Sequence, residues 1–170
     1  MSHAQYARNE LLSEVAIHMA DNRIPRLDGP VTDFARLLSA MEINQITQML
    51  SAYESETCHQ LAVLTVPTLY GDSIESFSLQ VANHWKLGRK VTDNGILIVL
   101  ASRERAVRIE IGKGFERHIS NAKAAEIMNE SMIPKFATGA FATGLNAGLS
   151  LLIEEARKMV VSREGLPDQL

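Results

Sequence analysis

The stretch KVTDNGILIVLASRERAVRIEIGKGFE, residues Lys90 to Glu116, decides the fold of this chain. Its first half holds a continuous aliphatic run, residues 96–100, which is typical of a strand buried on both faces. Its second half alternates apolar and charged residues over 107–111, which is typical of a strand covered on one face. The charged connection between them is too short for a parallel crossover, so the two strands form an antiparallel hairpin. The hairpin therefore places Asp93 near Gly114.

A strand and a helix precede this hairpin. Residues 61–66 are rich in aliphatic and β-branched side chains and stop at Pro67, as a buried strand does. The segment 71–75 then opens a helix with an aspartate or serine cap, and Gly88 marks its end. A crossover of this length implies parallel pairing with the hairpin's first strand and a right-handed connection. The predicted sheet is therefore short and mixed.

Four further helices are expected around this sheet. One covers about residues 7–20, and a second begins at a capping box that starts at Ser39. After the hairpin, Asn121 is expected to cap a helix that Pro134 interrupts, and a last helix covers about 140–160. Helices that alternate with a short mixed sheet predict an α/β fold, a three-layer α/β/α sandwich of a single domain.

Composition excludes several classes of protein. The chain has 170 residues, 46% of them hydrophobic, which suits one globular domain with its own core. A net charge of −3 without a basic run argues against a nucleic-acid partner. The longest apolar run is far shorter than the roughly 20 residues of a membrane span, so no transmembrane segment is expected. Cys58 is the only cysteine, which excludes an intramolecular disulfide and a structural cysteine–zinc site.

A series of motifs, in order along the chain, resembles those of the TPM-domain family. They are Val31–Ala35 (Val-x-Asp-x-Ala), Val66–Glu75, Trp85–Gly88, Asp93–Gly95 with the aliphatic run after it, Arg108–Glu116, and the Pro-x-Phe-x-x-Gly-x-Phe-x-x-Gly pattern from Pro134 to Gly144. The resemblance covers about residues 24 to 157, and on it the chain is identified as a member of this family. We expect a helical extension over 1–23, a TPM-like domain over 24–160 and a C-terminal tail over 161–170.

This resemblance implies a fold and a range of functions. TPM domains are α/β/α sandwiches, usually exported and often tethered to a membrane, and the plant members act in the thylakoid lumen in photosystem maintenance. Some resemble acid phosphatases in activity, and several bind divalent cations, calcium especially, in an acidic cleft. Because fold does not decide function, the candidate residues are weighed one by one.

The open end of the hairpin gathers candidate ligands. Asp93 offers the carboxylate oxygens that calcium and magnesium favour. Asp-Asn-Gly is equally ordinary turn chemistry, and we give the two interpretations equal weight. The hairpin brings Glu116 alongside, and Asn121 lies at the start of the next helix. One pocket is expected here, with oxygen ligands for a cation beside backbone N–H groups that can face a phosphate.

Asp33 is included because it matches the family motif. The helix that follows Ser39 places Asp33 at the opposite end of the sheet, but the intervening segment spans up to roughly 20 Å when extended and can return it to the pocket. Asp33 and Asp93 are therefore the candidate catalytic residues. Asp33, Asp93, Glu116 and Asn121 are the candidate metal ligands.

Several residues weaken this cation site. Many family members have an aromatic residue at Lys113, a glycine at Arg117 and an aspartate at Asn121, so weak binding of Ca²⁺ or Mg²⁺ is expected. Gly112-Lys113-Gly114 can cradle a phosphate, but it lacks the spacing of a P-loop, and such glycines more often permit a bend. His118 is expected to be a surface histidine.

Three functions follow from these residues. The first is a divalent-cation-binding accessory domain of the cell envelope, which aids maintenance or assembly of a membrane complex and has at most weak phosphatase activity. Its partner is then a membrane protein complex or an envelope protein. The second is a metal-dependent acid phosphatase, and the third is a non-catalytic protein-binding module with a vestigial pocket. The non-enzymatic functions are favoured, because a hydrolase of this kind needs at least two carboxylates and a general acid, and the sequence places only Asp93 and Glu116. Family habit predicts a periplasmic or extracytoplasmic location, while the lack of a visible signal peptide leaves a cytoplasmic one open.

Overall fold

The protein is built on a four-stranded mixed sheet. The computed structural model describes residues 23–88 and 92–164, so the helix expected over residues 7–20 lies outside the described part. The strands are β1 (Val31–Asp33), β2 (Gln60–Val66), β3 (Gly95–Ala101) and β4 (Ala106–Ile111), in the order β1-β2-β3-β4. The first three are parallel and β4 is antiparallel to β3, as the hairpin predicts.

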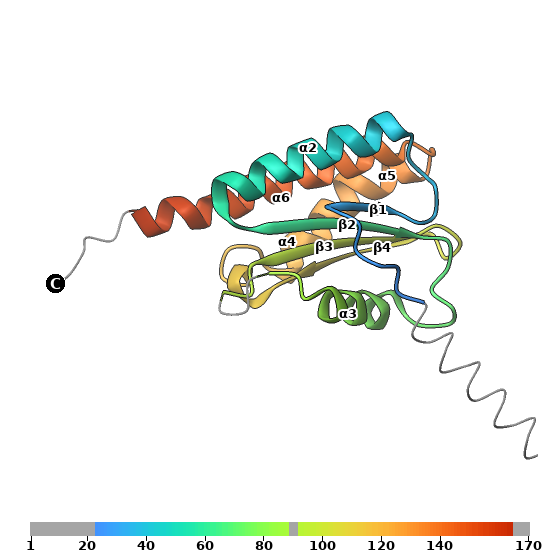
Figure 1. Cartoon of the computed structure of the whole chain (residues 1–170), viewed down its shortest axis with the longest axis horizontal. Coiled ribbons are helices and arrows are strands. Elements are labelled where there is room, and N and C mark those ends of the chain that lie inside the picture. Colours follow the sequence, from blue (N-terminus) through green and yellow to red (C-terminus); the bar gives the residue numbers. More distant parts are fainter. Residues whose placement is uncertain (1–22, 89–91, 165–170) are drawn as a thin grey trace, which may run out of the picture.

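Helices cover both faces of this sheet (Figure 1). One face carries α2 (Ala40–Thr57), α4 (Asn121–Ile127), α5 (Ile133–Phe136) and α6 (Phe141–Glu164), and the other face carries α3 (Ile74–Trp85). The fold is therefore the predicted α/β/α sandwich. Within the described residues, none of the helices combines the length and the apolar character that crossing a bilayer requires.

Strand β3 lies at the centre and is buried on both faces. Ile96 and Ile98 pack in the core under α2 and α6, while Leu97 and Val99 pack against α3. These four side chains are at most 1% exposed, which explains the unbroken aliphatic run in the sequence.

Strand β4 differs from the expected strand with one covered face. Its charged side chains, Arg108 and Glu110, lie beside α3 and are only partly exposed. The Ser78 hydroxyl donates to Glu110 Oε1 over 2.7 Å, and Arg108 Nε donates to the same oxygen over 2.9 Å. The polar face of β4 is thus half covered by a helix that supplies a hydrogen-bond partner.

The predicted cap of the helix after the hairpin needs correction. Ser120 rather than Asn121 caps α4, because its hydroxyl accepts the Lys123 N–H over 3.1 Å, and Asn121 is the first helical residue. The regular α-helix is interrupted before Pro134, as predicted, although the chain continues in helical form. A π-helical turn over Met128–Met132 leads into α5, where the proline sits in the first turn and needs no N–H partner. By contrast, the capping box of Ser39 with Glu42 is confirmed.

Glu104 joins the turn between β3 and β4 to the loop that follows β2. Its Oε1 accepts the Thr68 hydroxyl over 2.7 Å and the Leu69 N–H over 3.0 Å. Desolvation acts to raise the pKa of Glu104, but these hydrogen bonds and the neighbouring Arg103 charge together hold that pKa below its ordinary value. The ionised carboxylate therefore stabilises the connection.

Replacing Glu104 with glutamine should make the protein less stable only where the carboxylate is ionised. Because the folded-state pKa is lowered, the stabilisation is fully present above the ordinary value of 4.5 and is lost as pH falls through the folded pKa. The effect should be modest, since the side chain is exposed. Urea unfolding of both proteins from neutral to acidic pH measures it. A stability difference that does not shrink at acidic pH would contradict the role of the charge.

Candidate functional site

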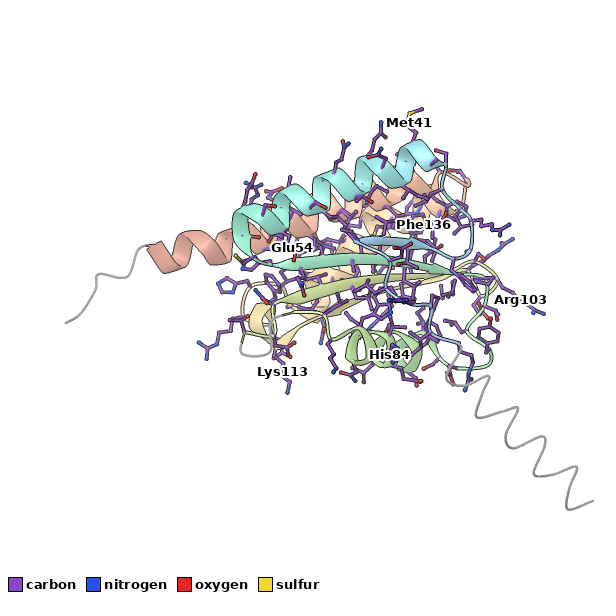
Figure 2. The ribbon with its side chains drawn as sticks, viewed as in Figure 1. Met41, Glu54, His84, Arg103, Lys113 and Phe136 are labelled. Carbon is purple, nitrogen blue, oxygen red and sulfur yellow. The ribbon has the colours of Figure 1, made fainter. Side chains whose placement is uncertain are left out.

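The strand register separates the two candidate aspartates. Asp33 pairs with Thr65 of β2, and Thr65 pairs with Leu100 near the end of β3. Asp93 lies just before Gly95, where β3 begins. At about 3.3 Å per residue, roughly 20 Å separate the two aspartates along the strand direction. The prediction that Asp33 returns to the pocket of Asp93 is therefore wrong. Lys113 and Arg103 mark these two opposite ends of the molecule (Figure 2).

The carboxylate of Asp33 instead holds the turn between β1 and α2. Its Oδ1 accepts the Leu37 N–H over 3.0 Å, and its Oδ2 accepts the Leu38 N–H over 2.9 Å. The Thr65 hydroxyl also donates to Oδ1. Both carboxylate oxygens are thus occupied by groups of the chain itself, which makes Asp33 a structural residue at this edge and explains why it does not reach the other one.

At the other edge, Asp93 lies near Gly114, as the predicted hairpin requires. Its carbonyl oxygen accepts the Gly114 N–H over 3.1 Å, and its carboxylate Oδ2 accepts the Lys113 N–H over 3.2 Å. Lys113 begins a short 3-10 turn, η1 (Lys113–Phe115), so the carboxylate caps that turn from across the hairpin. Asp93 is exposed and has a left-handed φ of 43°, which aspartate tolerates better than most residues.

Glycines allow the backbones to meet at this end. A Cβ on Gly112 would lie 2.2 Å from the Asp93 carbonyl oxygen, and one on Gly114 would lie 2.2 Å from the Thr92 carbonyl oxygen. A Cβ on Gly88 would lie 2.7 Å from the Gly95 nitrogen. The Gly112-Lys113-Gly114 sequence therefore serves a close approach of two backbones rather than the expected bend, because neither glycine has a positive φ.

The remaining predicted ligands lie further along the same segment. Glu116 closes η1 and Asn121 begins α4. Both side chains are exposed, and neither forms a hydrogen bond or ion pair with the described residues. The structure thus brings Asp93 against the segment that leads into Glu116, while Asn121 follows after one further turn.

Two buried polar atoms occur in the same segments. Thr92 Oγ1 and His118 Nδ1 are buried side-chain atoms without a hydrogen-bond partner in the described part of the chain. Such an atom costs roughly 1–3 kcal/mol unless a water or ligand satisfies it. His118 is half-buried, and its Nδ1 is covered. Thr92 was not among the predicted residues, and its only signal in the sequence is its place beside Asp93.

The donor atoms at this end suit a hard cation that is held weakly. Carboxylate, hydroxyl and carbonyl oxygens are the ligands that Ca²⁺ and Mg²⁺ prefer. However, the described residues contain no group of three or more His, Cys, Asp or Glu side chains that is placed to hold a metal ion. Lys113 and Arg117 add positive charge to the same segment, which lowers the affinity for a cation.

The fold and the hairpin end together define a class of protein. It is a small α/β/α sandwich whose mixed sheet ends in a hairpin closed by glycines and one aspartate. The chain belongs to the TPM-domain family, because the family model for the TPM domain matches residues 31–155.

Three solved structures resemble this chain. The N-terminal domain of a protein from P. gingivalis is 30% identical, with 77% of this chain and 92% of that chain covered and a TM-score of 0.68. The N-terminal domain of the cg2496 protein from Corynebacterium glutamicum is 16% identical, with coverage of 85% and 88% and a TM-score of 0.58. The BA42 protein from the psychrophilic bacterium Bizionia argentinensis is 22% identical, with coverage of 74% and 82% and a TM-score of 0.59. The last two share the fold. No curated protein matches the chain.

Proposed function

We propose that this chain is a divalent-cation-binding accessory domain of the cell envelope, which aids the maintenance or assembly of a membrane complex. Asp93 and Glu116 weakly hold Ca²⁺ or Mg²⁺ at the open end of the hairpin. The observation that supports this site is the exposed Asp93 carboxylate, which accepts the Lys113 N–H and follows directly on Thr92, whose buried hydroxyl has no hydrogen-bond partner among the described residues. The envelope location, periplasmic or extracytoplasmic, and the membrane-complex partner follow from the resemblance to exported TPM domains.

The cation is the ligand that these donors favour, and one ligand set explains several features together. The Lys113 N–H occupies one carboxylate oxygen of Asp93, while the other has no hydrogen bond to the described residues. The Thr92 hydroxyl belongs to the residue next to it. Glu116 adds a second carboxylate from the segment beyond η1. Few charged ligands predict an affinity in the millimolar range, as in extracellular calcium modules.

Phosphatase activity is at most weak in this proposal. Asp33 lies at the opposite edge with both oxygens occupied, so two carboxylates remain for a cation and a water nucleophile. One observation favours the alternative of a metal-dependent acid phosphatase. Among the described residues the buried Nδ1 of His118 has no hydrogen-bond partner, which leaves this imidazole as a candidate general acid that donates a proton to the leaving group. The third alternative, a protein-binding module with a vestigial pocket, is favoured by the positive charges of Lys113 and Arg117.

A calcium titration followed by NMR tests the cation site. We expect saturable amide shifts at Asp93, Gly114 and Glu116, with a dissociation constant on the order of 1 mM. Asp93→Asn keeps an oxygen for the Lys113 N–H but removes the charge, and should weaken binding about tenfold. Asp72→Asn removes the same charge at the opposite edge of the sheet and should leave the affinity unchanged.

The same samples, assayed with para-nitrophenyl phosphate, separate the alternatives. No shift at the hairpin end with either calcium or magnesium at several times the expected constant would remove the cation from the proposal. Turnover that disappears in Asp93→Asn and in His118→Gln would favour the phosphatase instead. Turnover that survives in Asp93→Asn would show that any phosphatase activity lies elsewhere.

A further inference from the structure

The edge of the sheet opposite the cation site carries a set of exposed side chains that the proposed function does not use. We call it the arginine–aromatic edge, and it consists of Phe34, Arg36, Tyr70, Arg103 and Arg105. Phe34 is 54% exposed and Tyr70 is 50% exposed, and the three arginines are exposed as well. Aromatic residues and arginine are the types that carry most of the binding energy in protein interfaces.

These side chains come from three loops at the ends of three adjacent strands. Phe34 follows β1, and its N–H donates to the Thr65 carbonyl of β2 over 3.1 Å. On the other side of β2, the Arg103 N–H donates to the Pro67 carbonyl over 3.1 Å. Because neighbouring strands lie about 4.8 Å apart, the strip from Phe34 to Arg103 is roughly 10 Å wide. Arg103 projects from this end of the molecule (Figure 2).

The loops behind the arginine–aromatic edge are fixed before any partner arrives. In the first loop, the carboxylate of Asp33 and the carbonyl and hydroxyl of Thr65 accept backbone N–H groups. Glu104 ties the other two loops together through Thr68 and Leu69. These hydrogen bonds fix the loop backbones, which hold the side chains of Phe34 and Tyr70 in exposed positions. A preformed surface loses little conformational entropy on binding.

Backbone conformation points to the same surface. Arg36, Tyr70 and Arg105 have φ angles of 54°, 54° and 52°. The left-handed region costs residues other than glycine roughly 1 kcal/mol each, and it accumulates at functional sites. Half of the six described non-glycine residues with positive φ thus belong to the arginine–aromatic edge.

The positive charges at this edge, unpaired among the described residues, are complementary to carboxylates. Arg23, Arg108 and Arg157 form ion pairs with acidic side chains. In the described part of the chain, Arg36, Arg103 and Arg105 form none. The acidic residues of the same loops are already engaged, because Asp33 and Glu104 accept hydrogen bonds from the loops and Asp72 forms an ion pair with Arg23. The guanidinium groups are therefore available, and their planar donors match carboxylates in two-point contacts.

We propose that the arginine–aromatic edge binds an acidic segment of a partner protein that also carries an apolar side chain. Carboxylates of the segment contact Arg36, Arg103 and Arg105, and the apolar side chain packs on Phe34 and Tyr70. A membrane surface fits less well, since lipid-binding patches usually hold four to eight basic residues and the chain carries a net charge of −3. This docking site lies at the opposite edge from the cation site, so either proposal can fail without the other.

The test uses a synthetic peptide in which glutamates alternate with leucine and phenylalanine. Two control peptides have lysine in place of glutamate or alanine in place of the large apolar residues. Titrated into the ¹⁵N-labelled protein at low salt, the first peptide should shift the amides of Phe34, Tyr70 and Arg103 with a dissociation constant on the order of 100 μM. The lysine peptide should cause no such shift, and the alanine peptide should bind about tenfold more weakly.

Variants make the result specific. The double variant Arg103→Glu with Arg105→Glu should weaken peptide binding about tenfold or more, and Phe34→Ala should weaken it severalfold. Arg117→Glu is the matched control, because it reverses an exposed arginine beyond the hairpin end, and it should bind as the unaltered protein does. All these side chains are exposed, so the folded spectrum should persist. No saturable shift at the edge would overturn the proposal. So would equal shifts with the lysine peptide, or edge shifts caused only by vesicles that contain phosphatidylserine.

Discussion

Replacing Asp33 with alanine is expected to lower the free energy of unfolding by about 3 kcal/mol. The change removes the acceptor of three donors at once, the N–H groups of Leu37 and Leu38 and the hydroxyl of Thr65. Thr65 is completely buried, whereas Leu37 and Leu38 are only half-buried, so water can reach part of the vacated site. For that reason the expected loss is below the sum of three charge-assisted hydrogen bonds.

Urea unfolding at neutral pH measures this loss, and two variants control it. Asp33→Asn keeps one acceptor oxygen but turns an NH₂ group toward a donor, so about half of the loss should remain. Asp28→Ala removes an exposed aspartate whose side chain has no bond to the described residues, and it should stay within about 0.5 kcal/mol of the unaltered protein. A loss of stability in Asp33→Ala no larger than in Asp28→Ala would contradict the structural role.

The same variants separate structure from function. Because Asp33 lies roughly 20 Å from Asp93 along the strands, Asp33→Asn should leave the calcium shifts at the hairpin end unchanged. A folded Asp33→Asn protein that loses its calcium shifts would mean that the cation site includes the opposite edge. The family motif around Asp33 would then mark a ligand rather than a loop anchor.

Much of the fold follows from signals that are local in the sequence. The aliphatic run of β3, the alternation in β4 and the capping box at Ser39 each lie within one element, so periodicity and capping chemistry predict both strands and the cap correctly. The half-covered polar face of β4 depends on α3 and does not follow from its alternation. The position of Asp93 against Gly114 also follows, because a short hairpin connection fixes the register.

Features that depend on distant partners could not be predicted in this way. Strand β1 has three residues, too few for a periodic pattern, and exists through its pairing with β2. The role of Asp33 depends on Thr65, which lies 32 residues away in the sequence. The buried atoms of Thr92 and His118 likewise result from tertiary packing. At α4, Ser120 and Asn121 are both good caps, and only the observed hydrogen bond to Lys123 distinguishes them.

The second large effect is expected for Gly112→Ala, which should lower the free energy of unfolding by about 3 kcal/mol. The φ of Gly112 is −65°, which alanine adopts freely, so the cost is steric rather than conformational. The new Cβ would lie 2.2 Å from the Asp93 carbonyl oxygen and 2.8 Å from that of Gly95. Both contacts are with backbone, which no side-chain rotation can relieve. The hairpin end must open, and the hydrogen bond from the Gly112 N–H to the Gly95 carbonyl weakens.

Gly139→Ala is the matched control because its cost is conformational, whereas the cost of Gly112→Ala is steric. Its Cβ would meet no atom within 4 Å, but its φ of 78° is left-handed, so it should cost only about 1 kcal/mol. Urea unfolding ranks the two variants, and a calcium titration adds a second readout. Opening the hairpin moves Asp93 away from the segment that leads to Glu116, so Gly112→Ala should weaken the calcium shifts while Gly139→Ala preserves them. If Gly139→Ala proves the more destabilising, close backbone approach is not the reason for glycine at position 112. If calcium binds Gly112→Ala normally, the cation site does not depend on the closed hairpin end.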